Sequence, residues 1–467
     1  MKSLAVVVIT IFTSFTMFAQ NITGKWNGIL KVPGMQIRIA FNVTKTNSGY
    51  KSTMDSPDQK AFGIPVETTD FTNGIVKFAI PKGLIEYQGT ANDDSTIIGY
   101  LKQAGQSFPL NLSRTEAEKE KVLRPQEPIK PYPYYAEDVT FQNKKANITL
   151  AGTLTLPNQQ GNFPAVVLIS GSGPENRDEE IMGHKPFLVL SDFLTKNGIA
   201  VLRFDDRGTA QSKGNFSAAT SADFATDVEA AVNYLLTRKE IIKSKIGLMG
   251  HSEGGIIAPM VAVQNKNVSF IVLLAGTGIP GDQLLLLQQE LVGRAMGASD
   301  IDLLKEKTIN TGAYKLITKS TDNQKLKTEL TTYYTKAYKD NPIPDSSKSM
   351  STNDLVNFQV KTLTTSWIQY FIKYNPQPTL QKVKCPVLAV NGSKDLQVPA
   401  QVNLDAIKNA LTKGGNKNVT IKELPGLNHL FQECTTGSPN EYATIQQTFS
   451  PTAMAAILSW LQTQIKP

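Results

Sequence analysis

A series of short apolar runs, separated by stretches with helical periodicity, constrains the fold of this chain more than any other feature. The runs are PAVVLIS, IAVLRFD, KIGLMG, FIVLLAG and CPVLAVNG. Between the second and third runs, one face of a helix is formed by Phe224, Val228, Ala231, Val232 and Leu235. Strands that are apolar throughout and alternate with helices predict a parallel sheet covered by helices on both faces.

This alternation is interrupted at residues 278–380. The interrupting segment has several helical stretches and no strand between them, and the sequence then returns to the strand PVLAVNG. A helical insertion between two strands of a sheet predicts a cap over the strand ends. We therefore expect residues 137–467 to form one doubly wound α/β domain with a helical cap.

Residues 20–114 follow a different pattern, with short segments separated by Gly, Asn, Asp and Ser. In QIRIAFNV, the apolar residues Ile37, Ile39, Phe41 and Val43 share one face of a strand. This predicts a small antiparallel β-barrel or sandwich. Its opening, GKWNG, resembles the first-strand Gly-x-Trp of lipocalin-like barrels.

The two remaining segments connect or precede these domains. Residues 115–136 are charged and then rich in proline, which predicts an extended linker. Residues 1–19 begin with a lysine, continue with an apolar stretch and end at Ala19 before polar residues, which predicts a signal peptide. The apolar stretch is short for a membrane span, so we expect a secreted or periplasmic protein without stable membrane insertion. A retained N-terminal anchor is the alternative.

Composition excludes several classes of function. The net charge is +8, but the lysines and arginines are scattered, so we do not expect nucleic-acid binding. The chain has three histidines and no spacing of His, Cys and Asp that suits a metal, so we expect no metal or other cofactor. Cys385 begins a strand and Cys434 follows the last one. The two cysteines are therefore expected at opposite ends of the sheet, about 20 Å apart. Because a disulfide needs Cα atoms within about 7 Å, we predict none between them.

The segment Gly250–Gly254 has the form G-x-S-x-G and directly follows the apolar run KIGLM. Its glycines allow a sharp turn from strand to helix, which exposes the central Ser252. A serine nucleophile needs a base and an orienting acid. His251 is a poor base because the turn carries its side chain away. His429 and Asp395 each follow an apolar strand, and sites in open α/β sheets gather at such strand ends.

The order Ser252, Asp395, His429, with each residue after a strand, resembles the α/β-hydrolases over residues 137–467. Within that superfamily, GHSEGG, LISGSGPENRDE and RFDDRGTAQSKG resemble secreted bacterial esterases of the prolyl-oligopeptidase-like branch, which is related to the S9 peptidases. The resemblance implies that Ser252 attacks a carbonyl group and that His429 transfers the proton. It also implies that Asp395 orients the imidazole.

The resemblance also implies an oxyanion hole made of two backbone N–H groups. One is the N–H of Glu253. The other comes from the loop after AVVLIS, where Ser172 matches the family's His-Gly-x-Pro type of loop. Because Ser170 stands where the family commonly has histidine, Gly171 or Gly173 could be the second donor instead.

Several polar residues have both a functional and a structural interpretation. Gly171 and His184 are candidates for contact with the substrate, although His184 could be an ordinary loop histidine. Glu253 could recognise a substrate amine or be structural. The turn Asp205–Arg207 is expected to be a structural device held by ion pairs.

These observations favour a serine carboxylesterase that forms an acyl-enzyme on Ser252. Its substrate would be a small-molecule or glycan-linked ester held under the cap. A serine exopeptidase of the same fold is an alternative, although such relatives usually carry a large propeller domain. A binding module with an inactive hydrolase fold is a further alternative, which the complete triad disfavours. The oligomeric state is open, with a homodimer as one alternative.

Overall fold

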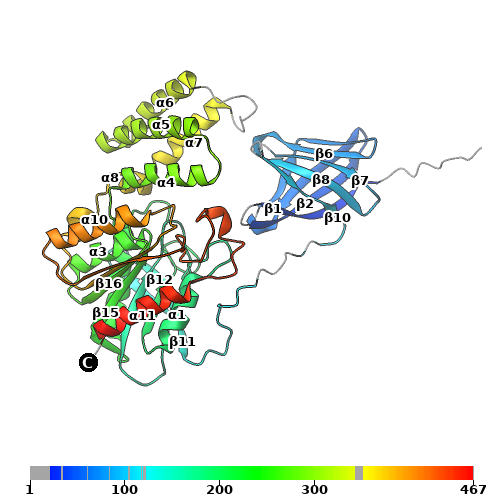
Figure 1. Cartoon of the computed structure of the whole chain (residues 1–467). Coiled ribbons are helices and arrows are strands. Elements are labelled where there is room, and N and C mark those ends of the chain that lie inside the picture. Colours follow the sequence, from blue (N-terminus) through cyan, green and yellow to red (C-terminus); the bar gives the residue numbers. More distant parts are fainter. Residues whose placement is uncertain are drawn as a thin grey trace, which may run out of the picture. The chain divides into compact units, whose positions relative to one another are not determined.

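The computed structural model describes residues 21–32, 35–59, 61–83, 85–103, 106–116, 118, 123–341 and 351–465. The expected signal peptide at residues 1–19 lies outside these ranges. The chain forms two compact units, one that ends at Glu120 and one that begins at Lys121 (Figure 1). Each unit has its own hydrophobic core.

Among the described residues, the first unit is a 10-stranded antiparallel sheet. Its strands are β1 (Gly24–Val32), β2 (Met35–Thr46), β3 (Gly49–Ser56), β4 (Ala61–Val66), β5 (Thr68–Thr72), β6 (Ile75–Ile80), β7 (Ile85–Ala91), β8 (Thr96–Gln103), β9 (Gln106–Pro109) and β10 (Leu112–Ser113). The strand order is β4-β3-β2-β1-β10-β8-β7-β6-β5, with β9 beside β8. A hydrogen bond of 2.6 Å between the hydroxyls of Ser52 and Thr69 joins β3 to β5. The sheet therefore curls until its two ends meet, which confirms the expected small antiparallel β-domain.

Large side chains fill the interior of this β-domain. Phe41 and Phe78 stack with ring centroids 4.3 Å apart. Trp26 is fully buried and donates its indole N–H to the Ile22 carbonyl oxygen at 2.7 Å. The guanidinium carbon of Arg114 lies 3.6 Å from the centroid of the Trp26 ring. Alternating apolar residues therefore build a packed core, because each strand turns every second side chain inward.

The expected linker at residues 115–136 is only partly a spacer. Arg124 donates hydrogen bonds to the backbone oxygens of Gly183, Ala443 and Ile445. Gln126 donates to the Phe449 carbonyl oxygen at 2.7 Å. These bonds to loop carbonyls make the chain from residue 123 onward part of the second unit, a contact that proline content alone does not predict.

Among the described residues, the second unit contains an 8-stranded sheet. Its strands are β11 (Tyr135–Asn143), β12 (Ile148–Leu156), β13 (Phe163–Ile169), β14 (Ala200–Phe204), β15 (Ile241–His251), β16 (Val268–Leu274), β17 (Val387–Gly392) and β18 (Val419–Leu424). The order is β11-β12-β14-β13-β15-β16-β17-β18. Strand β12 is antiparallel to both neighbours, and all pairs from β14 to β18 are parallel. This confirms the expected α/β-hydrolase sheet.

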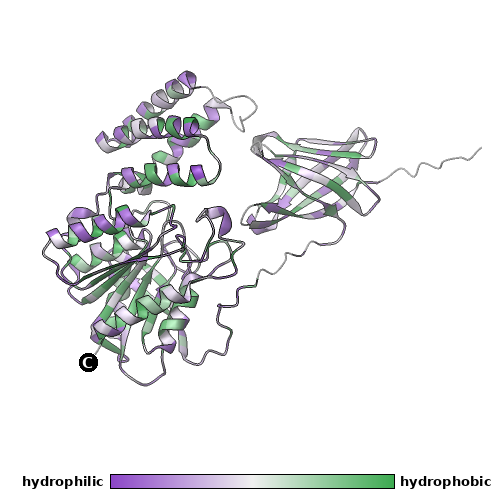
Figure 2. Cartoon of the chain, viewed as in Figure 1, coloured by the Kyte–Doolittle hydropathy of each residue, from purple (hydrophilic) through white to green (hydrophobic). Residues whose placement is uncertain are grey.

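Helices cover both faces of this sheet. They are α1 (Pro186–Lys196) and α11 (Pro451–Ile465) on one face, and α2 (Ser221–Thr237), α3 (Gly254–Gln264) and α10 (Ala400–Lys413) on the other. The adjacent valines Val166 and Val167 of β13 point into these two separate cores. Figure 2 shows the apolar strands in green, enclosed by helices that carry purple on their outer sides. The continuous apolar runs follow from burial on both faces.

A helical insertion lies between β16 and β17. It consists of α4 (Gly281–Ala295), α5 (Asp300–Lys319), α6 (Asn323–Asp340), α7 (Thr352–Leu363), α8 (Ser366–Lys373) and the short α9 (Gln377–Leu380). Its core includes the fully buried Ile317, Leu330 and Tyr334. Leu284 of α4 and Phe371 of α8 pack in a second cluster with residues of α3. We refer to α4–α8 as the cap.

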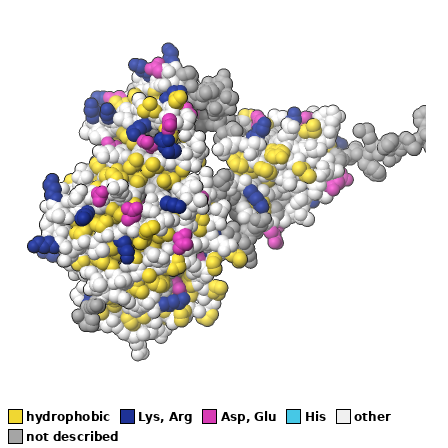
Figure 3. Space-filling view, viewed as in Figure 1, with side chains coloured by type: hydrophobic (Ala, Val, Ile, Leu, Met, Phe, Trp, Pro, Cys, Tyr) yellow, Lys and Arg dark blue, Asp and Glu magenta, His cyan; other side chains and the backbone are white. Residues whose placement is uncertain are grey.

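On the face drawn in Figure 3, lysine and arginine side chains are spread over the described residues, with aspartate and glutamate side chains among them. In the ranges that the structure describes, no helix is both long and apolar enough to span a bilayer.

Candidate active site

Ser252 occupies a sharp turn between β15 and α3. Its φ of +53° is in the left-handed region, which non-glycine residues rarely adopt. A Cβ at Gly250 would collide with the Gly254 carbonyl oxygen, and one at Gly254 would collide with the Ile169 carbonyl oxygen. Both positions therefore require glycine. The turn is fixed further by a hydrogen bond of 2.8 Å from the Ser252 N–H to the Leu274 carbonyl oxygen.

Asp395 and His429 form a buried hydrogen-bonded pair. Asp395 follows β17, and its Oδ1 accepts the backbone N–H groups of Gln397 and Val398, both at 2.8 Å. Its Oδ2 lies 2.7 Å from Nδ1 of His429, in the loop after β18. The Nδ1 atom therefore carries the proton, so Nε2 is available as a base.

Ser252 and His429 line the same cavity, of about 370 Å³. Its walls come from the strand ends of the sheet and from the cap. The cap contributes apolar and aromatic side chains, namely Leu284, Leu285, Trp367 and Phe371. The structure thus brings the three predicted triad residues together at the carboxyl ends of the parallel strands. Their catalytic roles remain predictions.

The loop after β13 supplies the candidate oxyanion donors. Ser172 and Gly171 both line the cavity. The Gly171 N–H, however, donates to Oε1 of Glu179 at 2.8 Å. Because this N–H is already engaged, Gly171 is a poorer candidate donor than Ser172. Gly173, the other alternative, is not among the residues that line the cavity. The other predicted donor, Glu253, follows Ser252 directly and also lines the cavity.

Ser170, which stands where the family commonly has histidine, anchors this loop. Its hydroxyl donates to Oδ1 of Asp206 at 2.8 Å. The other carboxylate oxygen of Asp206 accepts the Glu175 N–H at 3.0 Å. Burial raises the pKa of Asp206 well above its usual value, and both hydrogen bonds oppose that shift. Asp206 therefore anchors the loop through both of its carboxylate oxygens.

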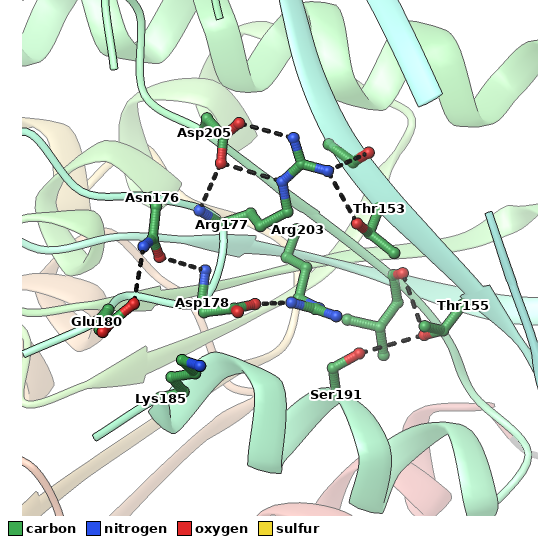
Figure 4. Close-up of polar contacts among 12 residues, drawn as sticks. Thr153, Thr155, Asn176, Arg177, Asp178, Glu180, Lys185, Ser191, Arg203 and Asp205 are labelled. Carbon is green, nitrogen blue, oxygen red and sulfur yellow. Dashed lines mark hydrogen bonds and ion pairs between the residues drawn. The ribbon is translucent and has the colours of Figure 1, made fainter. Parts of the chain in front are cut away.

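Ion pairs hold the next part of the loop (Figure 4). Arg177 donates to Asp205 at 2.7 and 3.0 Å and to the Thr153 hydroxyl at 3.0 Å. Asp178 forms an ion pair with Arg203, which points toward it in Figure 4. On the other side of the turn, Arg207 pairs with Asp227 at 2.6 Å. The structure therefore places both Asp205 and Arg207 in ion pairs.

The structure does not place His184, a predicted substrate contact, among the residues that line the cavity. His184 is fully buried, and its Nε2 donates to the Tyr442 carbonyl oxygen at 2.7 Å. Its Nδ1 lies 3.0 Å from the Thr448 hydroxyl. Burial lowers the pKa of His184 to about 4, so the ring is neutral. A bridge between Ile181 and His184 turns the loop so that Ile181 and Met182, and not His184, line the cavity.

The carboxylate of Glu253 is already satisfied within the protein. It accepts the Ser221 hydroxyl at 2.6 Å and the indole N–H of Trp367 at 2.8 and 3.0 Å. Burial raises the pKa of Glu253, and hydrogen bonds from Ser221, Trp367 and Ser172 oppose that shift. Its side chain therefore joins the cap to the turn at Ser252 and is not free to recognise an amine.

Two functional candidates were missed by the sequence reasoning. Glu175 lines the cavity, and its pKa is raised to about 7 by burial and by the nearby charge of Glu179. The Nδ1 atom of His251 lies 2.9 Å from Oε1 of Glu179. Its Nε2 atom lies 2.9 Å from the His429 carbonyl oxygen. No sequence motif signals these contacts, because they depend on how the loops after β13 and β18 fold back toward Ser252.

The described part of the chain holds no group of three His, Cys, Asp or Glu side chains that could bind a metal ion. Cys385 and Cys434 are free thiols.

The strand order, the turn at Ser252 and the Asp395–His429 pair define an α/β-hydrolase. Residues 146–410 match the X-Pro dipeptidyl-peptidase (S15) family, and the chain belongs to this family.

Individual relatives match parts of the chain. Esterase EstD of Thermotoga maritima is 30% identical over 179 residues, which are 38% of this chain and 42% of that esterase. The alignment thus spans less than half of that relative. An uncharacterized 31.7 kDa protein from the traX-finO intergenic region of Escherichia coli is 26% identical over 54% of this chain and 79% of its own.

Solved structures are similar at lower identity. The α/β hydrolase GrgF from Penicillium is 15% identical, with a TM-score of 0.43, over 71% of this chain and 99% of that one. The Pyrococcus furiosus esterase Pf2001 is 17% identical, with a TM-score of 0.41, over 71% and 93%.

Proposed function

We propose that this protein hydrolyses carboxylic acyl esters through an acyl-enzyme on Ser252. The observation that carries the proposal is the Asp395–His429 hydrogen bond of 2.7 Å beside a cavity that both His429 and Ser252 line. The partial likeness to an esterase of Thermotoga maritima supports the same chemistry.

The geometry suggests a sequence of steps. His429 takes the hydroxyl proton of Ser252 through Nε2 as the serine oxygen attacks the ester carbonyl carbon. The N–H groups of Glu253 and Ser172 stabilise the oxyanion that forms. His429 then gives its proton to the leaving alcohol, which leaves the acyl group on Ser252. Water, activated by the same imidazole, hydrolyses the acyl-enzyme and restores the serine.

The cavity suits a small ester. A volume of about 370 Å³ is at the lower end for small-molecule sites. The cap side is largely apolar, with Leu284, Leu285 and Phe371 beside the polar Gln288, and we propose that its apolar part receives the acyl chain. The alcohol could be a small molecule or a glycan. From the pattern of residues 1–19 and the resemblance to prolyl-oligopeptidase-like esterases, we propose that the protein is exported.

Exopeptidase activity is a second candidate because of Glu175. Glu175 lines the cavity that holds Ser252, and its carboxyl group could pair with a substrate amine. Membership of the X-Pro dipeptidyl-peptidase family also favours peptidase activity. At pH values above about 7, where Glu175 is ionised, such pairing would be strongest.

The first prediction separates these functions by turnover. We expect residues 20–467 to hydrolyse p-nitrophenyl acetate and butyrate faster than aminoacyl or dipeptidyl p-nitroanilides. Ser252→Ala should lower ester turnover by about 10³-fold or more, because the nucleophile is removed. Absence of Ser252-dependent turnover of any substrate would favour the inactive binding module.

Glu175→Gln is the discriminating variant. If the protein is an esterase, this change should leave KM for neutral esters within about threefold. If it is an exopeptidase, amide turnover should exceed ester turnover, and the change should raise KM for free-amine substrates about tenfold or more, because a buried charge pair is lost.

A further inference from the structure

We propose that Glu179 and His251 are positioning residues, which together fix the main chain of the catalytic base and of the oxyanion loop relative to the nucleophile. The inference rests on the proposed hydrolysis at Ser252. Neither residue lies in the predicted triad or oxyanion hole.

One carboxylate oxygen of Glu179 joins two parts of the site. Its Oε1 accepts the Gly171 N–H at 2.8 Å, in the residue before the candidate donor Ser172. The same atom lies 2.9 Å from Nδ1 of His251. Because Gly171 and Ser172 are consecutive, the position of Glu179 determines where the Ser172 N–H points.

The other nitrogen of His251 reaches the catalytic base. Nε2 lies 2.9 Å from the His429 carbonyl oxygen, which can only accept a hydrogen bond. Nε2 therefore carries a proton. Since His251 is the last residue of β15 and precedes Ser252, both connections start from the strand that carries the nucleophile. Three loops are thus tied together by one side-chain pair.

The backbone at Glu179 is strained, and such strain is typical of residues with a functional role. Its φ is +51°, in the left-handed region, although the residue is not glycine. The preceding Arg177 and Asp178 are held by Asp205 and Arg203 (Figure 4). These ion pairs keep the strained residue in place, so its buried carboxylate faces His251.

The charges of Glu179 and His251 are compatible with a neighbouring His429 that becomes positively charged during the reaction. The rings of His251 and His429 have centroids 4.8 Å apart. Burial by itself would lower the pKa of His251, but the charge and hydrogen bond of Glu179 raise it to about 9. A protonated His251 with an ionised Glu179 is neutral overall, so it does not oppose the imidazolium of His429. Asp395 and Glu175 are the other acids that face this group.

The second prediction concerns Glu179→Gln, with Glu180→Gln as a matched control. Glu180 is the next residue of the loop, and its side chain is exposed. With p-nitrophenyl acetate we expect Glu179→Gln to lower kcat about 10- to 100-fold, because misplaced catalytic groups lose rate. KM should change less than about threefold. Glu180→Gln should match the wild type in both constants.

The pH profile is a readout that general destabilisation would not change. In the wild type, kcat should fall as pH rises through about 9, where His251 loses its proton and the pair is broken. In Glu179→Gln this alkaline limb should vanish, because His251 no longer has a charged partner. His251→Gln should lose it too, and the double variant should be no slower than the slower single variant.

The rate at which a fluorophosphonate labels Ser252 tests this inference independently of the proposed ester substrate. The labelling rate depends on His429 and the oxyanion hole but not on the correct ester. We expect Glu179→Gln and His251→Gln to slow labelling by the same factor as kcat. Wild-type rates of labelling and an unchanged alkaline limb in folded variants would overturn the inference. Rapid labelling without ester turnover would instead reject the proposed ester substrates.

Discussion

At the scale of single residues, the environment of each carboxyl group decides its role. Asp395 accepts three hydrogen bonds and stays available to His429. Glu253 is satisfied by Ser221 and Trp367. Glu175 also lines the cavity, and burial and the charge of Glu179 raise its pKa to about 7. Three acids of one site thus have three different surroundings: Asp395 bonds to a histidine, Glu253 bonds to the cap, and Glu175 lines the cavity.

The third prediction concerns Glu175 and the stability of the fold. Burial, with the charge of Glu179, raises its pKa from 4.5 to about 7 in the folded protein. The folded state therefore binds this proton more tightly than the unfolded state. The stabilisation that this proton gives is present below pH 4.5 and is lost as pH rises toward 7.

We accordingly expect Glu175→Gln to raise the thermal midpoint by a few degrees at pH 8 and to leave it nearly unchanged at pH 4.5. The measurement is thermal unfolding at both pH values, with Glu180→Gln as control. An equal shift at both pH values would show that ionisation of Glu175 is not the cause.

At the scale of secondary structure elements, the cap is attached by two of its helices. Leu284 of α4 and Phe371 of α8 pack against Ile256 and Met260 of α3. Two polar connections accompany this packing. The indole N–H of Trp367 on α8 donates to the Glu253 carboxylate, and Gln288 of α4 donates to Gln397 at 3.2 Å. The residue after Ser252 is therefore in direct contact with the cap.

The fourth prediction is that Trp367→Phe destabilises the protein by about 1–3 kcal/mol, because a buried carboxylate loses a donor. Denaturant unfolding measures this. Trp460→Phe is the matched control, since the indole of Trp460 bonds to the exposed hydroxyl of Thr420 at 3.1 Å. Equal losses of unfolding free energy in the two variants would mean that the bond to Glu253 stabilises the protein no more than an exposed hydrogen bond does. In the double variant with Glu253→Gln, the loss should be smaller than the sum of the two single losses.

At the scale of the whole molecule, the order of the β-domain, the α/β sheet and the cap along the chain could largely be predicted. The β-domain, the α/β sheet and the cap each have a distinct period of apolar residues. The grouping of Ser252, Asp395 and His429 could be predicted because parallel strands bring their carboxyl ends to one edge.

Contacts between distant loops could not be predicted in this way. His251 meets Glu179 across 72 positions and His429 across 178 positions. The burial of His184 depends on Tyr442 and Thr448, in a loop without regular periodicity. Such contacts depend on how irregular segments fold back, and alternation of polarity carries no information on that.

The most direct test of the central claim is the intact mass of the whole chain after reaction with excess fluorophosphonate, followed by peptide mapping. Our account predicts one adduct, on Ser252, with ester turnover lost in proportion to labelling and no adduct on Ser252→Ala. Ester turnover that persists in fully labelled protein, or an adduct on another residue, would contradict it.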